Sequence, residues 1–309
     1  MCAKPIWLAE RQLHVPCGIC LLCRNRYARD WAIRCWHEAQ LHECDCPGLQ
    51  CVDPLRHRGN CFGTLTYDDD SLPKHGSLDK VAAQLFMKRL RKGIDPIKVK
   101  FYLSGEYGEK NKRPHYHFML FGYRLERGVE VPSDSGFPVY ESPELSEYWK
   151  HGIVTVGDVS FASACYVTQY IVNKKDKIAR TYKKWNCDPD TGELNEIEVE
   201  FSHMSRGGSR KGSSGIGAGW YDKFRPEVER NDNVVVDGNE VMPPRYYDYL
   251  LVKRDLAAAR VVKLRRERKS KMYNKVGREW SQEYYEDRRD RMAREVIARR
   301  ELEELERRL

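Results

Sequence analysis

Two short apolar runs joined by a turn, within residues 98–122, constrain the fold of this chain more than any other feature. Residues 98–106 and 113–121 are each of strand length, and the connector at 107–114 contains glycine, asparagine and proline. The pattern predicts an antiparallel hairpin. Because side chains alternate along a strand, His115 and His117 point to one face, and the aromatic residues between and after them point to the other.

A carboxylate at the loop end of this hairpin, Glu106, is predicted to lie roughly opposite His115. Two imidazoles and one carboxylate would then converge on one divalent cation and leave coordination positions open for substrate oxygens. Two alternatives stay open. Glu109, in the loop, is a competing carboxylate, and Glu106 could simply end a strand in solvent, since short His-x-His patterns arise often by chance.

Residues 161–175 are predicted to form a helix that follows a strand at 152–157 and is capped by Ser160 or Ser163. Helical spacing of four places Tyr166, Tyr170 and Lys174 on one face. Aromatic residues at this spacing are usually core residues. A lysine at the end of the same stripe argues against complete burial, and the two phenols are therefore candidate nucleophiles.

Cysteines are concentrated at the start of the chain, with nine of the eleven in the first 61 residues. Cys17, Cys20 and Cys23 form two overlapping Cys-x-x-Cys turns, a spacing typical of structural zinc sites. Further ligands are expected among the later cysteines of this segment, Cys44, Cys46, Cys51 and Cys61. The alternative is a set of buried free thiols, because cysteine also packs as a small apolar residue.

Basic residues are concentrated in residues 253–278, which carry eleven lysines and arginines and two acids within a chain of net charge +8. Such a segment is typical of phosphate neutralisation and salt-sensitive DNA binding, although a solvated helix face would look the same. Residues 1–16 lack the apolar run of a secretory signal, and we find no apolar stretch of membrane-spanning length. We therefore expect no membrane partner and a cytoplasmic location.

The order of predicted elements indicates an α+β fold with a central antiparallel sheet that carries the His-x-His strand and is flanked by helices. Helices are expected at 24–42 and 78–91, a further strand at 62–67, and a charged helical extension at the C-terminus. We predict three parts: a cysteine-rich segment at 1–60, a catalytic domain at 61–250, and the extension at 251–309.

Several motifs together resemble the HUH endonucleases. His115-Tyr116-His117 matches the His-hydrophobe-His motif of that superfamily, residues 61–67 are similar to its first strand motif, and residues 166–170 resemble the paired-tyrosine helix of rolling-circle initiators. Residues 105–117, 215–221 and 243–247 are similar to the replication initiation proteins of the gokushovirus branch of Microviridae. The likeness covers about residues 17–249. Gln169 departs from it, because relatives often carry lysine between the tyrosines.

This resemblance implies an HUH-type fold and a Mg²⁺- or Mn²⁺-dependent enzyme. It implies that Glu106, His115 and His117 hold the metal and that Tyr166 and Tyr170 attack single-stranded origin DNA, with Lys174 as the nearer candidate for charge stabilisation. The products would be a 5′-phosphotyrosine and a free 3′-hydroxyl that primes a host polymerase. The absence of a helicase-type phosphate loop points to a host helicase, and a phage protein would act in the host bacterial cytoplasm.

Two rival interpretations remain at this stage. A non-enzymatic zinc-clip protein that binds nucleic acid would explain the cysteines and the basic segment. A relaxase or transposase of the HUH superfamily would also be compatible with paired tyrosines.

Overall fold

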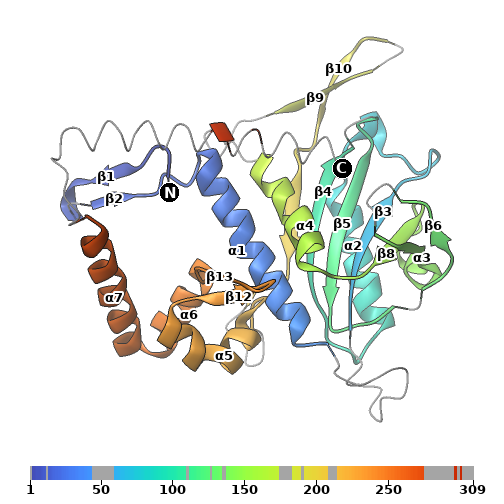
Figure 1. The fold of residues 1–309 in the computed structure, drawn as a ribbon. Helices are drawn as coiled ribbons and strands as arrows, with labels where there is room; N and C mark the ends of the chain where they lie inside the picture. The colour runs from blue at the N-terminus through green and yellow to red at the C-terminus, as the bar shows by residue number, and fades with distance from the viewer. Residues whose placement is uncertain are drawn as a thin grey trace. The chain divides into compact units, whose positions relative to one another are not determined.

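The computed structural model describes residues 2–11, 13–43, 59–108, 111–125, 127–133, 137–173, 183–188, 191–207, 214–274, 296–297 and 300 of the chain. The chain forms two compact units, one of Met1–Asp30 with Tyr221–Leu309 and one of Trp31–Trp220 (Figure 1).

A seven-stranded antiparallel sheet forms the centre of the larger unit, in the order β11-β4-β5-β3-β8-β7-β6. Its strands are β3 (Asn60–Thr66), β4 (Lys100–Tyr107), β5 (Pro114–Phe121), β6 (Glu130–Val131), β7 (Val139–Glu141), β8 (Val154–Gly157) and β11 (Phe201–Met204). The predicted hairpin is β4 and β5, and β5 is an interior strand between β4 and β3. The predicted α+β class with an antiparallel sheet is therefore confirmed.

Helix α2 (Lys80–Gly93) covers one face of the sheet. Asp79 begins it as the N-cap, accepting hydrogen bonds from the backbone N–H groups of Val81 and Ala82. Its apolar residues recur at helical spacing, and Phe86 and Leu90 are buried in the same cluster as Tyr116, Phe118 and Leu120 of β5. This face of β5 therefore belongs to the main hydrophobic core, which fixes the opposite direction for His115 and His117.

The opposite face of the sheet packs against α4 (Phe161–Asn173) and the part of α1 (Leu21–Gln40) that follows Trp31. Ala164 and Val167 of α4 are buried with Tyr102, Met119 and Phe121 of the sheet. Figure 1 shows α4 and α2 on opposite sides of β4 and β5.

The predicted serine cap of α4 is present. Ser160 accepts from the backbone N–H of Ser163 at 3.0 Å, and the Ser163 hydroxyl oxygen accepts from the N–H of Ser160 at 2.8 Å. This reciprocal pair fixes where α4 begins.

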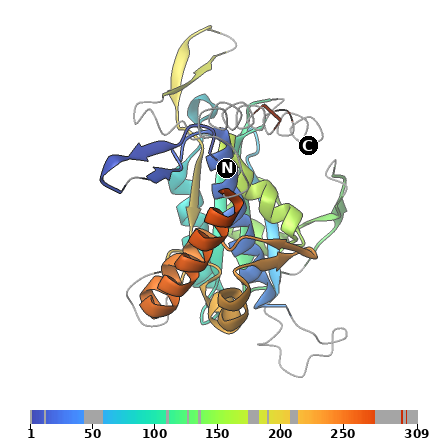
Figure 2. The ribbon, with the colours of Figure 1, turned by 60° about the vertical axis from the view of Figure 1, so that its left-hand side comes forward.

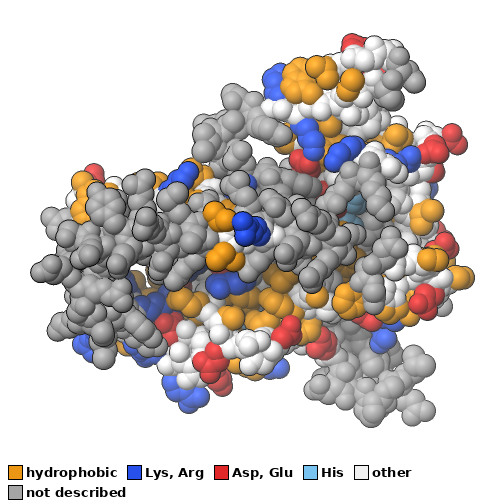
Figure 3. Space-filling view, turned by 45° about the horizontal axis from the view of Figure 1, so that its top comes forward, with side chains coloured by type: hydrophobic (Ala, Val, Ile, Leu, Met, Phe, Trp, Pro, Cys, Tyr) orange, Lys and Arg blue, Asp and Glu red, His pale blue; other side chains and the backbone are white. Residues whose placement is uncertain are grey.

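The larger unit contains four further elements. They are the 3₁₀ turn η2 (Lys74–Gly76), helix α3 (Pro143–Trp149), and the antiparallel strands β9 (Lys184–Cys187) and β10 (Leu194–Ile197). The hairpin of β9 and β10 projects beyond the end of the sheet (Figures 1 and 2). Its Trp185 and Leu194 side chains are exposed, and apolar side chains are visible at this end in Figure 3.

The smaller unit contains β1 (Ile6–Leu8), η1 (Ala9–Arg11), β2 (Leu13–Val15) and the start of α1. Its C-terminal half contains most of α5 (Ala218–Asn231), the hairpin β12 (Val234–Val236) and β13 (Asn239–Val241), α6 (Arg245–Arg254) and α7 (Leu256–Asn274). Arg266 of α7 pairs with Asp232 and Asp248, at 2.6 and 2.9 Å. Among the described residues, no helix is both long and apolar enough to cross a bilayer.

Candidate active site

Glu106, His115 and His117 meet at the loop end of the β4–β5 hairpin. Glu106 pairs with His115 in the strand register, as the sequence predicted. Glu106 Oε1 lies 2.7 Å from Nε2 of His115 and 3.0 Å from Nε2 of His117. The two ring centroids are 4.9 Å apart and the rings are nearly perpendicular, at 85°. One carboxylate oxygen thus faces two imidazole nitrogens.

These three residues are largely shielded from solvent. The side chain of Glu106 is 3% exposed, that of His117 is 8% exposed, and that of His115 is 18% exposed. Burial favours a neutral carboxyl, but the hydrogen bonds from His115 and His117 outweigh it and lower the pKa of Glu106 to about 2. The site therefore holds a buried anion between two nitrogen ligands.

The donor set fits a divalent cation. One ligand atom from each of the three residues lies within 4.8 Å of the other two, so a single ion can reach all of them. Two histidines and one carboxylate leave coordination positions open for substrate, as in catalytic rather than structural sites.

Neighbouring groups direct both imidazoles toward this position. Nδ1 of His117 lies 2.9 Å from the hydroxyl oxygen of Thr64, which is opposite His117 in the register of β3 and β5. Nδ1 of His115 lies 3.2 Å from the carbonyl oxygen of Arg113. A carbonyl oxygen only accepts, so Nδ1 of His115 donates and its Nε2 is left with a lone pair. Such outer contacts orient metal ligands and set their tautomer.

Thr64 was quoted from the sequence only as part of a strand motif, and its contact with His117 was not predicted. The signal that could have found it is the alternation along residues 62–67. Had β3 been placed beside β5, this alternation would have set Thr64 against His117 and Thr66 against His115.

Tyr166 brings a phenol to the same position from the other layer. Its hydroxyl lies 3.3 Å from Nε2 of His117, and the ring centroids are 5.0 Å apart. The Phe62 ring contacts both, with centroids 5.8 Å from His117 and 6.2 Å from Tyr166. A hydroxyl at this distance from the carboxylate–imidazole group stands where it can meet a substrate bound there.

The other predicted residues of the site are only partly described. Tyr170 lies in α4 one turn after Tyr166, and its side chain is outside the described part of the structure. Lys174 is also outside the described residues. Their roles stay predictions.

The predicted cysteine group does come together, with a partner that was not predicted. The sulfurs of Cys17, Cys20 and Cys23 lie within 4.8 Å of one another and of Cys2. Cys61, suggested from the sequence as a further ligand, is instead buried in β3 within the main core. Cys44, Cys46 and Cys51 lie outside the described residues.

Comparison with known proteins identifies relatives among phage replication proteins. The model of a family described as replication-associated protein ORF2 matches residues 60–176, a range that contains the Glu/His group and α4. Replication-associated protein VP4 of Bdellovibrio phage phiMH2K is 30% identical over 75% of this chain and 65% of its own length. Replication-associated protein ORF4 of Chlamydia phage 1 is 28% identical over 77% and 54%.

Replication-associated protein ORF2 of Spiroplasma virus 4 is 24% identical over 93% of this chain and 77% of its own length. The chain thus spans less than two thirds of the length of the relatives from Bdellovibrio phage phiMH2K and Chlamydia phage 1. No solved structure matches it significantly. The resemblance found in the sequence is confirmed at this level, and the chain belongs to the family of replication-associated proteins of Microviridae phages.

Proposed function

We propose that this protein is a metal-dependent HUH endonuclease that nicks and rejoins single-stranded origin DNA to start and finish rolling-circle replication. The observation that carries the proposal is the position of the Tyr166 hydroxyl, 3.3 Å from Nε2 of His117 in the Glu106–His115–His117 group. A nucleophile and a candidate metal centre at one point are what phosphodiester cleavage through a covalent intermediate requires.

The chemistry places each group in a role. A Mg²⁺ or Mn²⁺ ion held by Glu106, His115 and His117 would polarise the scissile phosphate and neutralise charge on it. The Tyr166 oxygen forms a bond to phosphorus while the bond to the 3′-oxygen breaks, which gives a 5′-phosphotyrosine and a free 3′-hydroxyl. The phenol loses its proton as it attacks, and the leaving 3′-oxygen gains one. Phe62 limits the movement of the Tyr166 ring through its contact with it.

A second tyrosine on the same helix face gives the enzyme a way to end replication. We propose that Tyr170 cleaves the regenerated origin while Tyr166 still holds the first 5′ end, or the reverse. The new 3′-hydroxyl then attacks the first phosphotyrosine and closes a circle. Lys174, predicted on the same stripe, would stabilise charge on the phosphate.

The cellular setting follows from the same proposal. The 3′-hydroxyl would prime a host DNA polymerase, a host helicase would separate the strands, and the reaction would take place in the host bacterial cytoplasm. We place the nicking and joining activity in residues 61–250. Zinc at Cys17, Cys20 and Cys23 has no part in this cleavage, because thiolates closed around their own ion offer no group to the phosphate.

Covalent capture tests the proposal most directly. Single-stranded phage genome DNA is incubated with the full chain and Mn²⁺, and the protein–DNA adduct is digested and mapped by peptide mass. We expect the nucleotide on Tyr166 or Tyr170, and no adduct with chelator or in H117A. Y249F is the matched control, because Tyr249 is an exposed tyrosine on α6, and we expect its adduct yield to equal that of the wild type.

The outcomes also separate the rival functions. DNA binding without any adduct would favour a non-enzymatic zinc-clip protein. Joining of two different DNA ends, rather than release of unit circles, would favour a relaxase or transposase. An adduct on a tyrosine outside α4 would contradict the assignment of the nucleophile.

A further inference from the structure

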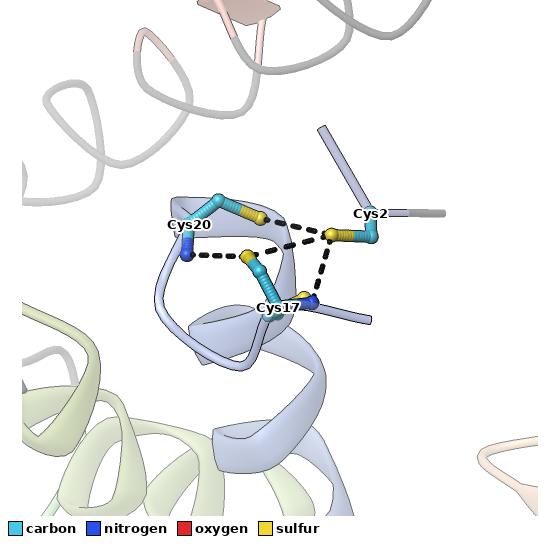
Figure 4. Close-up of side chains that lie close together, drawn as sticks. Cys2, Cys17 and Cys20 are labelled. Atoms are coloured by element: carbon cyan, nitrogen blue, oxygen red, sulfur yellow. Dashed lines mark hydrogen bonds between the residues drawn. The ribbon is translucent and has the colours of Figure 1, made fainter. Parts of the chain in front are cut away.

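Four cysteine sulfurs meet at the N-terminal end of α1 in the smaller unit, and Figure 4 labels three of these residues, Cys2, Cys17 and Cys20. Cys2 precedes β1 and Cys17 follows β2, while Cys20 and Cys23 lie just before and within the first turn of α1. Because β1 and β2 pair antiparallel, with Ile6 opposite Val15, the two flanks of the hairpin are brought together. The hairpin therefore carries Cys2 to Cys17, which is 15 residues away in sequence.

The spacing of the sulfurs fits a tetrahedral metal ion. The Cys2 sulfur lies 3.4 Å from that of Cys17 and 3.8 Å from that of Cys20, and all four sulfurs lie within 4.8 Å of one another. Four sulfurs at about 2.3 Å from a tetrahedral zinc ion are separated by about 3.8 Å. A disulfide would need about 2.05 Å, and all four cysteines are free thiols in this structure.

Backbone N–H groups point at the sulfurs, as they do around thiolates. The N–H of Cys17 donates to the sulfur of Cys2 at 3.2 Å, and the N–H of Cys20 donates to the sulfur of Cys17 at 3.3 Å. Gly18, with φ of +76°, makes the turn that directs the second of these bonds.

The cysteines also differ in how readily they ionise. Burial opposes ionisation of Cys17, but hydrogen bonds from the N–H groups of Cys20 and Ile19 outweigh it and lower its pKa to about 7. Burial raises the pKa of Cys23 to about 12. A bound cation is therefore needed for all four sulfurs to be thiolates at neutral pH.

The helix supports a negatively charged cluster at this position. The first turn of α1, which the structure describes in full, contains no acidic side chain. Four thiolates on one divalent ion carry a net charge of about −2. That charge is favourable beside the unpaired N–H groups and positive dipole end of a helix.

We propose that Cys2, Cys17, Cys20 and Cys23 bind one zinc ion in a closed four-sulfur site that fixes the start of the chain to the N-terminal end of α1. On binding, each thiol releases its proton to solvent and its sulfur bonds to zinc. Four protein ligands leave no open position, so the site is structural. This site does not depend on the proposed nicking activity, and Cys2 supplies the ligand that the Cys-x-x-Cys pattern lacked.

Metal analysis of the full chain tests the site without any DNA substrate. Protein purified with reductant and gel filtered should contain one zinc per chain. After replacement of zinc by Co²⁺, we expect the sulfur-to-cobalt absorption to fall by about one quarter in C2S, one sulfur in four. The matched control is C187S, since Cys187 is an exposed cysteine on β9 and its loss should leave both measurements unchanged. Zinc-free protein, or a full cobalt spectrum in C2S, would overturn the proposal.

A second measurement keeps the test decisive if C2S does not fold. The native wild-type protein is alkylated before and after treatment with a chelator, and modified cysteines are mapped by peptide mass. We expect Cys187 to react in both samples and the four cluster cysteines to react only after chelation. Equal modification of the cluster in both samples, or a disulfide between two of its members, would show that no metal is held there.

Discussion

The contact between Thr64 and His117 gives the sharpest prediction about the candidate active site. Thr64→Val keeps the shape of the side chain and removes only the hydroxyl that lies 2.9 Å from Nδ1 of His117. With Nε2 directed at a metal ion, Nδ1 carries the proton and donates to that hydroxyl. The substitution therefore leaves a poorly accessible N–H without its partner and frees the imidazole to turn.

The expected magnitude follows from the cost of an unsatisfied donor. Leaving one buried donor unpaired costs about 1–3 kcal/mol. At about 1.4 kcal/mol per tenfold change, Mn²⁺ affinity should weaken roughly 5- to 150-fold. This agrees with the range of about 10- to 100-fold for loss of a group that orients a metal ligand. Isothermal titration of the full chain with Mn²⁺ measures the effect, and T64S should restore most of the affinity.

Thr66→Val is the matched control for this experiment. Thr66 is on the same strand and opposite His115, but its hydroxyl donates to the carbonyl oxygen of Ile153 at 3.0 Å rather than to a histidine. We expect T66V to lower stability while leaving Mn²⁺ affinity close to that of the wild type. Equal affinities for T64V and the wild type, or equal losses in T64V and T66V, would refute the orienting role of Thr64.

Three further predictions concern stability and are checked by urea unfolding. Gly63→Ala should cost about 1–3 kcal/mol, because a Cβ there would overlap the Phe118 ring and come within 2.9 Å of a strand carbonyl; an unchanged midpoint would contradict this. Burial lowers the pKa of His37 from 6.5 to about 3, so between these values the unfolded chain binds the proton and the folded chain does not. The free energy of unfolding should therefore fall by about 2 kcal/mol from pH 6.5 to 5, and H37F should reduce that fall. Arg266→Met should cost about 1–3 kcal/mol by leaving Asp232 and Asp248 unpaired, and neutralising both acids should recover most of it.

The hairpin and its pairing could be predicted because the information is local. The short connector at 107–114 leaves little freedom in register, and alternation then assigns each side chain to a face. For this reason Glu106 opposite His115 was predicted correctly from residues fewer than ten positions apart. The cap and extent of α4 were predictable on similar grounds, since Ser160 and Ser163 are adjacent to the helix they begin.

Contacts set by the order of strands or by weak elements could not be predicted. Thr64 meets His117 only because β3 lies beside β5, and nothing near Thr64 in the sequence specifies that neighbour. Cys2 reaches the other cysteines through β1 and β2, which have three residues each and no strong alternation. Arg266 was counted with the basic segment at 253–278, yet it is paired with two aspartates, so part of that charge stabilises the unit instead of facing solvent.

The three candidate metal ligands come from one hairpin, whereas Tyr166 comes from a helix 49 residues after His117. Loading of the ion and delivery of the nucleophile therefore depend on different stretches of the polypeptide, and damage to one need not harm the other. Substitutions that loosen α4 from its sheet, at Ala164 or Val167, should yield protein that still titrates with manganese but has lost strand scission. Such separation-of-function variants would hold an uncut origin in place, which makes them suitable for capturing the substrate complex.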